Sequence, residues 1–138
     1  MAQQWKVPFG ETVVNIDNLT TSFDDNQIVA SVVNTDTLVL YLDYEKGNET
    51  EIQIRFEYSD HRNLDNADFY VETILIDPNQ GIIQEFCHRL VESGRFRLAV
   101  LVSGQENMIR VSFRGEGTLT GGSLAVKYTT NNNRGMFS

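Results

Sequence analysis

The chain has 138 residues with 11 basic and 19 acidic side chains, which gives a formal net charge of −8. This length corresponds to one domain, and a hydrophobic content of 41% argues against both disorder and membrane spanning. Because nucleic acid phosphates would repel so acidic a chain, composition also argues against a nucleic acid partner.

The dominant pattern along the chain is an alternation of apolar and polar residues with a period of two, which is typical of β-strands. In Ile52-Gln-Ile-Arg-Phe-Glu-Tyr58 every second residue is apolar, so one face of this segment is expected in a core. In chain order, the predicted strands are 7–16, 27–33, 38–44, 52–58, 69–76, 96–102, 108–114 and 119–128.

Eight to nine strands separated by turn residues predict an all-β fold, an antiparallel β-sandwich or jelly roll. We expect residues 1–138 to form one such domain, with a short N-terminal arm (1–9) and a polar C-terminal tail (129–138).

Residues 82–91 fit two patterns. As a helix, this segment would gather five apolar residues on one face, and Gly94 would end it. As a strand, it would place Phe86, His88 and Leu90 on one face. We favour the strand, because residues 95–102 need a partner and Ser93-Gly94 would allow a tight reversal between the two.

Charge is unevenly distributed along the chain. Residues 1–54 carry −7, residues 55–88 carry −5 and residues 89–138 carry +4. Cross-strand ion pairs within one molecule would explain this pattern, and so would a head-to-tail interface between identical copies. For the second explanation, the residues expected to form a basic face are Arg95, Arg97, Arg110 and Arg114.

Cysteine usage and the first residues bear on the compartment. Cys87 is the only cysteine, so no intramolecular disulfide or thiolate zinc cluster is expected. The first residues lack a basic region followed by an apolar run, which predicts no secretory signal and synthesis in a reducing cytoplasm. Cys87 and His88 should point to opposite faces of a strand and therefore cannot form a catalytic pair with each other.

The loop 59–68 is rich in oxygen ligands of the kind that calcium prefers. Such a composition is more often that of a polar hairpin loop in which Asp and Asn bond their own backbone, and the loop lacks the glycine and glutamate of an EF-hand. We therefore expect no metal and no other cofactor. If this loop bound calcium, its ligands would be Asp60, Asp65 and Asp68.

Two other patterns bear on catalysis. Glu57 and Glu72 on neighbouring strands could supply the paired carboxylates of a glycosidase, as could many surface pairs of an acidic sandwich. The glycine-rich segment 115–122 lacks the Lys-Ser/Thr of a phosphate-binding loop and is interpreted as two turns. The sequence thus predicts no catalytic residues and no enzyme.

Aromatic and apolar residues occur near both ends. Trp5 and Phe9 lie in the N-terminal arm, and Met136 and Phe137 end the polar tail. These segments could lie on their own domain or fray, or they could dock on neighbouring subunits as anchors.

Several segments together carry a family resemblance: 41–60 (with Lys46-Gly-Asn-Glu-Thr50), 69–73, 93–98, 109–117 (with Gly115-Glu-Gly117) and 120–126. Over roughly residues 37–128 the chain resembles small β-sandwich virion proteins of tailed bacteriophages. It departs from them after Ser59, where an Asx-rich loop replaces the short Asp-Gly turn that such chains tend to have.

The resemblance implies a non-enzymatic structural protein of a phage particle, specifically a capsid decoration (cement) protein on the outer capsid surface. Its expected partners are the major capsid protein and further copies of itself, as a homo-oligomer such as a trimer. The alternatives are a neck or baseplate component of the particle, or a carbohydrate-binding module that uses Tyr41, Tyr44 and Tyr70.

Overall fold

The computed structural model describes residues 12–16, 19–77, 79–103 and 105–131. Within these ranges the chain forms β-strands and one short 3-10 helix, η2 (Leu64–Asn66), so it contains no helix long and apolar enough to cross a membrane.

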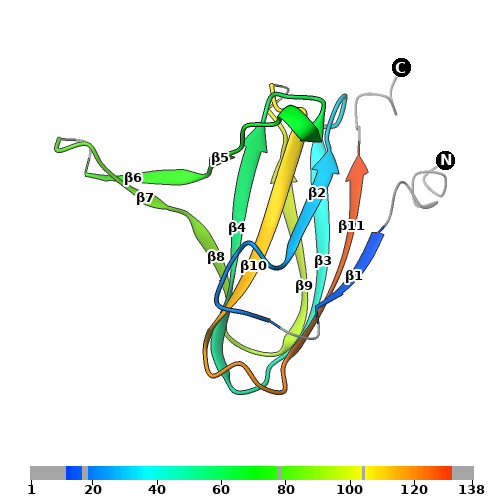
Figure 1. Ribbon diagram of the computed structural model, residues 1–138, viewed down its shortest axis with the longest axis vertical. Coiled ribbons are helices and arrows are strands. Elements are labelled where there is room, and N and C mark those ends of the chain that lie inside the picture. Colours follow the sequence, from blue (N-terminus) through cyan, green and yellow to red (C-terminus); the bar gives the residue numbers. More distant parts are fainter. Residues whose placement is uncertain (1–11, 17–18, 78, 104, 132–138) are drawn as a thin grey trace.

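Two antiparallel sheets pack face to face (Figure 1). The four-stranded sheet has the order β1-β11-β3-β9, with bounds Thr12–Ile16, Ser123–Asn131, Thr37–Glu45 and Gly94–Leu101. The five-stranded sheet has the order β2-β10-β4, with bounds Gln27–Ser31, Met108–Gly117 and Glu49–Ser59. Both β5 (Tyr70–Val71) and β8 (Cys87–Leu90) pair with the outer edge of β4. The remaining strands, β6 (Thr73–Asp77) and β7 (Ile82–Glu85), pair with each other.

The connectivity is that of a jelly roll. Apart from β5, β6 and β7, the described strands form two groups of four, β1-β11-β3-β9 and β2-β10-β4-β8, and the chain alternates between the two sheets. This is the double Greek-key order. The predicted all-β sandwich is therefore confirmed, and β5 to β7 form an insertion between its fourth and fifth strands.

The core lies between the two sheets and follows the period-two pattern. Leu38, Leu40 and Leu42 of β3 are buried, as are Ile52 and Ile54 of β4. Inward residues of β10 and β11 complete this core, namely Ile109, Val111, Phe113, Leu124 and Val126.

Residues 82–91 form strands, as expected, but they are divided into β7 and β8, and the predicted partner was wrong. β8 pairs with β4 and buries Leu90 opposite Ile52, whereas β9 pairs with β3 in the other sheet. The segment 91–93 thus crosses between sheets, since burial of Leu90 against β4 determines where β8 lies. The predicted strand 69–76 is also interrupted, because β5 ends before Glu72 and β6 begins after it.

Candidate interaction surfaces

The β6–β7 hairpin, residues 73–85, projects from the sandwich and is called the arm below (Figure 1). It leaves the five-stranded sheet between β5 and β8, which occupy successive parts of the same edge of β4. At this fork the Glu72 N–H donates to the carbonyl of Phe56 at 2.9 Å, and the Phe86 N–H donates to the carbonyl of Glu72 at 2.9 Å. Both branches of the arm are therefore joined to the sheet through Glu72.

Side chains also hold the base of the arm. The Tyr58 hydroxyl donates to Glu72 Oε1 at 2.6 Å, and Arg55 Nη1 lies 3.5 Å from Glu85 Oε1. Burial raises the pKa of Tyr58 well above its usual value, and the Glu72 carboxylate raises it further. The phenol thus stays protonated and keeps donating to Glu72.

Within the arm, Thr73 pairs with Glu85 and Leu75 with Ile83, and the register shifts between Leu75 and Asp77. In sequence the arm has five Ile or Leu residues, two carboxylates and no Lys or Arg. An isolated two-stranded ribbon is marginally stable in water. Among the described residues, the arm bonds to the sandwich at its base, and we therefore expect so apolar a ribbon to have a partner.

A second feature is a groove of about 500 Å³ on the outer face of the four-stranded sheet. Besides Leu42, Phe96 and Val126, its lining consists of two cross-strand rows over β9, β3 and β11: Arg97, Tyr41 and Lys127 in one, and Arg95, Asp43 and Ala125 in the other. We call these six residues the groove. They share one face because residues directly opposite each other in antiparallel strands point the same way.

The groove combines an aromatic ring with mostly positive charge. Tyr41 is 40% exposed, and Lys127 Nζ lies 5.8 Å from its ring centroid. Arg95 Nε lies 3.6 Å from Asp43 Oδ2, with both side chains mostly exposed, and Arg97 is exposed. Three cations against one carboxylate leave the groove positive overall.

The outer face of the five-stranded sheet is different, because its arginines surround a buried carboxylate. Glu57 is 3% exposed and accepts hydrogen bonds from Arg110 Nε at 3.1 Å and Arg110 Nη2 at 2.6 Å. Ser112 Oγ and Arg55 Nη2 donate to Glu57 Oε1 as well, at 3.2 and 3.4 Å. Burial alone would raise the pKa of Glu57, but Arg110, Arg55 and Ser112 more than offset this, and the pKa lies below its usual range.

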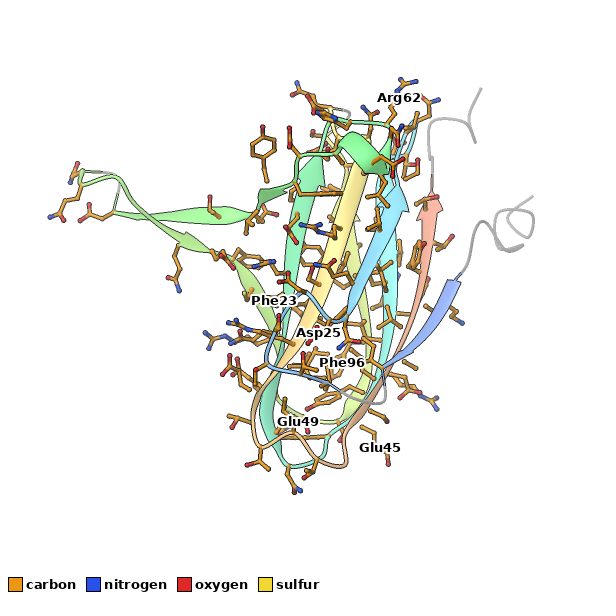
Figure 2. All side chains as sticks on the ribbon, in the orientation of Figure 1. Phe23, Asp25, Glu45, Glu49, Arg62 and Phe96 are labelled. Carbon is orange, nitrogen blue, oxygen red and sulfur yellow. The ribbon has the colours of Figure 1, made fainter. Side chains whose placement is uncertain are left out.

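Two phenylalanine rings stack on these arginines. The guanidinium carbons of Arg55 and Arg114 lie 4.4 and 4.2 Å from the Phe23 centroid, and that of Arg110 lies 4.2 Å from the Phe69 centroid. Phe23, labelled in Figure 2, is itself buried. We call Glu57, these three arginines, Phe23 and Phe69 the arginine cluster.

The predicted basic face is therefore divided. Arg95 and Arg97 line the groove, whereas Arg110 and Arg114 belong to the arginine cluster on the other sheet. Several acidic residues pair with bases distant in sequence, such as Asp43 with Arg95 and Glu51 with Arg89. Interleaving of the acidic and basic parts within one molecule thus accounts for much of the uneven charge.

The turn between β3 and β4 contacts the turn between β10 and β11 at one end of the sandwich. Both turns lie in segments that carry the sequence resemblance. Glu49 is buried and accepts hydrogen bonds from the Tyr44 hydroxyl and from the Gly47 N–H, the latter at 3.1 Å. Asn48 N–H donates to the Thr120 carbonyl at 2.9 Å, and a Cβ on Gly122 would lie 2.6 Å from a Glu49 oxygen. The glycines and Glu49 of these motifs therefore serve packing.

The residues considered for catalysis have different surroundings in the structure. Glu57 lies in the outer cluster, whereas Glu72 bonds Tyr58, the next residue of β4, which packs against the core. The two carboxylates thus have different partners, since Tyr58 donates to Glu72 and Arg110 donates to Glu57. Burial, followed by the charge of Glu85, raises the pKa of the Cys87 thiol, which disfavours the reactive thiolate.

The three tyrosines that a carbohydrate-binding module would use do not share a surface. Tyr44 is 2% exposed and holds Glu49, so its assignment to a binding surface was wrong. Tyr41 lies on the four-stranded sheet and Tyr70 on the five-stranded sheet. Tyr41 alone lines the groove.

In the Asx-rich loop, His61 Nε2 lies 3.8 Å from Asp60 Oδ1 and 3.9 Å from Asp68 Oδ2. The Asp65 N–H donates to Asn63 Oδ1 at 3.0 Å, which is the turn chemistry expected of such a sequence. Among the described residues, no group of three or more His, Cys, Asp or Glu is arranged to hold a metal ion. The proposed anchors Trp5, Phe9, Met136 and Phe137 lie outside the described residues.

The chain matches no protein-family model and no curated protein. Among solved structures it is similar to the SPBc2 prophage-derived protein YomS, with 10% identity and a TM-score of 0.45 over 88% of this chain and 93% of that one. A chain of the native virion of Kashmir bee virus gives 10% identity and a TM-score of 0.44 over 88% and 69% of the two chains. A CBM4 structure gives 14% identity and a TM-score of 0.43 over 91% and 74%. These distant similarities concern the β-sandwich fold, which phage, viral and carbohydrate-binding proteins share.

Proposed function

We propose that this chain is a non-enzymatic structural protein of a tailed-phage virion, a capsid decoration (cement) protein that binds the outer capsid lattice and stabilises the head. The observation that carries the proposal is the arm, an apolar ribbon that pairs with no other described strand and is anchored at its base by Glu72. A sandwich with such an arm can bridge neighbouring molecules. The sequence resemblance over residues 37–128 supports the same class.

In this function the partners are the major capsid protein and other copies of the chain, and nucleic acid and membrane are not bound. The chain is synthesised in the host cytoplasm and resides on the capsid surface. Many copies, each making modest contacts, would together resist expansion of the head, because simultaneous contacts multiply. Trp5, Phe9, Met136 and Phe137 would anchor the termini on neighbouring subunits.

The test is a comparison of particles with and without the protein. Particles that lack it should lose DNA at lower temperature or weaker osmotic shock, and adding the purified chain should restore resistance. Unchanged resistance would refute the cement function, and an electron-microscopic reconstruction showing the protein at the neck or baseplate would assign it there. Deletion of residues 1–9 or 131–138 should reduce capsid binding if the termini are anchors.

A second candidate is a carbohydrate-binding module, and Tyr41 in the groove favours it. Sugars stack on exposed aromatic rings, and the flanking Arg97 and Lys127 would suit an acidic saccharide. Calorimetric titration with neutral and acidic oligosaccharides tests this function. Binding that is lost in Tyr41→Ala and kept in Tyr70→Ala would support it, and no heat with either class of sugar would exclude it for those sugars.

A further inference from the structure

We propose that the groove of one copy binds the arm of a second copy, so that the chain associates head to tail. This inference rests on one part of the proposed function, the association of the chain with further copies of itself. It names both surfaces, the acidic apolar arm on the edge of the five-stranded sheet and the positive groove on the four-stranded sheet.

The arm needs a covering surface. Its two strands pair with each other and with no other described strand, and Figure 1 shows them directed away from the sandwich. A Cβ at Gly81, in the turn at its tip, would meet no atom within 4 Å. Because an exposed two-stranded ribbon is marginal in water, an arm this rich in Ile and Leu would gain stability by packing on a second sheet.

The groove has the complementary properties. Glu85 pairs with Arg55 at the base of the arm, which leaves Asp77 as the carboxylate that the arm offers to a partner, whereas the groove offers Arg95, Arg97 and Lys127 against one carboxylate. Among the described residues Arg97 has no ion pair, so its charge is available to a partner. Complementary charge of this kind fixes orientation and speeds association.

The geometry supports a ribbon as the occupant. Arg97, Tyr41 and Lys127 form one row across three strands, and Asp43 with its neighbours forms the next. The outer face of a sheet with such regular rows can accept a further β-layer, and the groove in it gives room for a ribbon above Tyr41 and Ala125. Because arm and groove are different surfaces of the same chain, the contact is heterologous and closes into a ring or continues as a filament.

Directed crosslinking tests the contact. In a Cys87→Ser background, Gln84→Cys marks the arm and Ala125→Cys marks the groove. Mixing these two proteins with a short bis-maleimide should yield a crosslinked dimer that neither yields alone. Gln27→Cys, at an exposed position of β2, replaces the groove cysteine as the matched control and should crosslink to the arm at background level.

Charge variants test the recognition. Arg97→Glu should weaken self-association, measured by sedimentation velocity, by about tenfold, which corresponds to about 1.4 kcal/mol. Arg62→Glu makes the same charge change at an exposed position of the Asx-rich loop and should leave association unchanged. The double variant Asp77→Lys/Arg97→Glu should recover part of the affinity. It places a positive charge on the arm and a negative charge in the groove, so the two surfaces again attract each other.

The outcomes separate this inference from the proposed function. A chain that is monomeric at all concentrations, or equal crosslinking of groove and control, would overturn the arm-and-groove contact even if the protein still binds capsids. Conversely, crosslinking with the expected pattern in a protein that neither binds nor stabilises heads would support the contact and refute the cement function. Folding of each variant is checked by urea denaturation.

Discussion

The outer faces of the two sheets both carry arginines, but these arginines have different surroundings. On the five-stranded sheet, Arg55 and Arg110 bind the buried Glu57 and stack on Phe23 and Phe69. On the four-stranded sheet, Arg95 and Arg97 remain exposed around Tyr41. An arginine is thus available to a partner only when no buried carboxylate or aromatic ring of its own chain engages it. The number of basic residues alone does not show which arginines are available.

The largest difference between the faces should be in stability. Arg110→Met keeps the apolar stem over Phe69 but leaves Glu57 buried with a weaker set of donors, and we expect it to lower the free energy of unfolding by about 3 kcal/mol. Arg97→Met, the matched change on the other sheet, should alter it by less than about 0.5 kcal/mol. Urea denaturation measures both. Equal effects would mean that the arginine cluster is no more structural than the groove.

A smaller effect should come from the aromatic ring of the arginine cluster. Phe23→Leu keeps an apolar side chain but removes the π face beneath Arg55 and Arg114. We expect a coupling energy of about 1 kcal/mol between Phe23→Leu and Arg114→Met in a double-mutant cycle. A coupling near zero would show that the ring acts through packing alone.

Acid should weaken the arginine cluster in particular. Since the pKa of Glu57 is lower in the folded state than in the unfolded chain, its contribution is present above the ordinary carboxyl pKa of 4.5 and is lost as pH falls through the folded value. Glu57→Gln should therefore be less stable at neutral pH and show a shallower loss of stability below about pH 4.5. Urea midpoints across this range test it, with Glu92→Gln at an exposed position as the charge-matched control.

The smallest effect is expected in the groove. The Arg95–Asp43 pair has side chains that are 87% and 60% exposed, so solvent screens it. Asp43→Asn should change the free energy of unfolding by less than about 0.5 kcal/mol, while making the groove more positive and strengthening self-association. A loss of more than about 1 kcal/mol would show that this pair is structural, and the contrast between the faces would fail.

Much of the sandwich could be predicted from sequence because its strands are half-buried. The alternation from Ile52 to Phe56 recurs in the structure as buried and less buried positions of β4, and it fails at the buried Glu57. Strand identity could thus be read locally. The pairing of β8 could not, because whether Leu90 packs on β4 or beside β9 depends on contacts between residues distant in the chain.

The candidate surfaces were less predictable for the same reason. The sequence marked Arg95, Arg97, Arg110 and Arg114 as one group, yet the sheet to which each strand belongs divides them. The arm was not predicted because residues 69–76 are rich in the aromatic and β-branched residues of an ordinary strand, and the interruption at Glu72 has no Gly or Pro. Charge patterns likewise could not show that Glu57 is buried.

The attachment of the arm to β4 has a mechanical consequence. The arm extends sideways from the strand axis (Figure 1), so a pull on it loads the hydrogen bonds of β5 and β8 along their own direction. β5 offers two residues to resist this force, whereas β8 offers four and a buried Leu90. β5, before the arm, should therefore separate from β4 first, which would let the Asx-rich loop extend. β8, after the arm, should stay paired with β4. The arm is thus expected to behave as a tether with one compliant and one stiff branch.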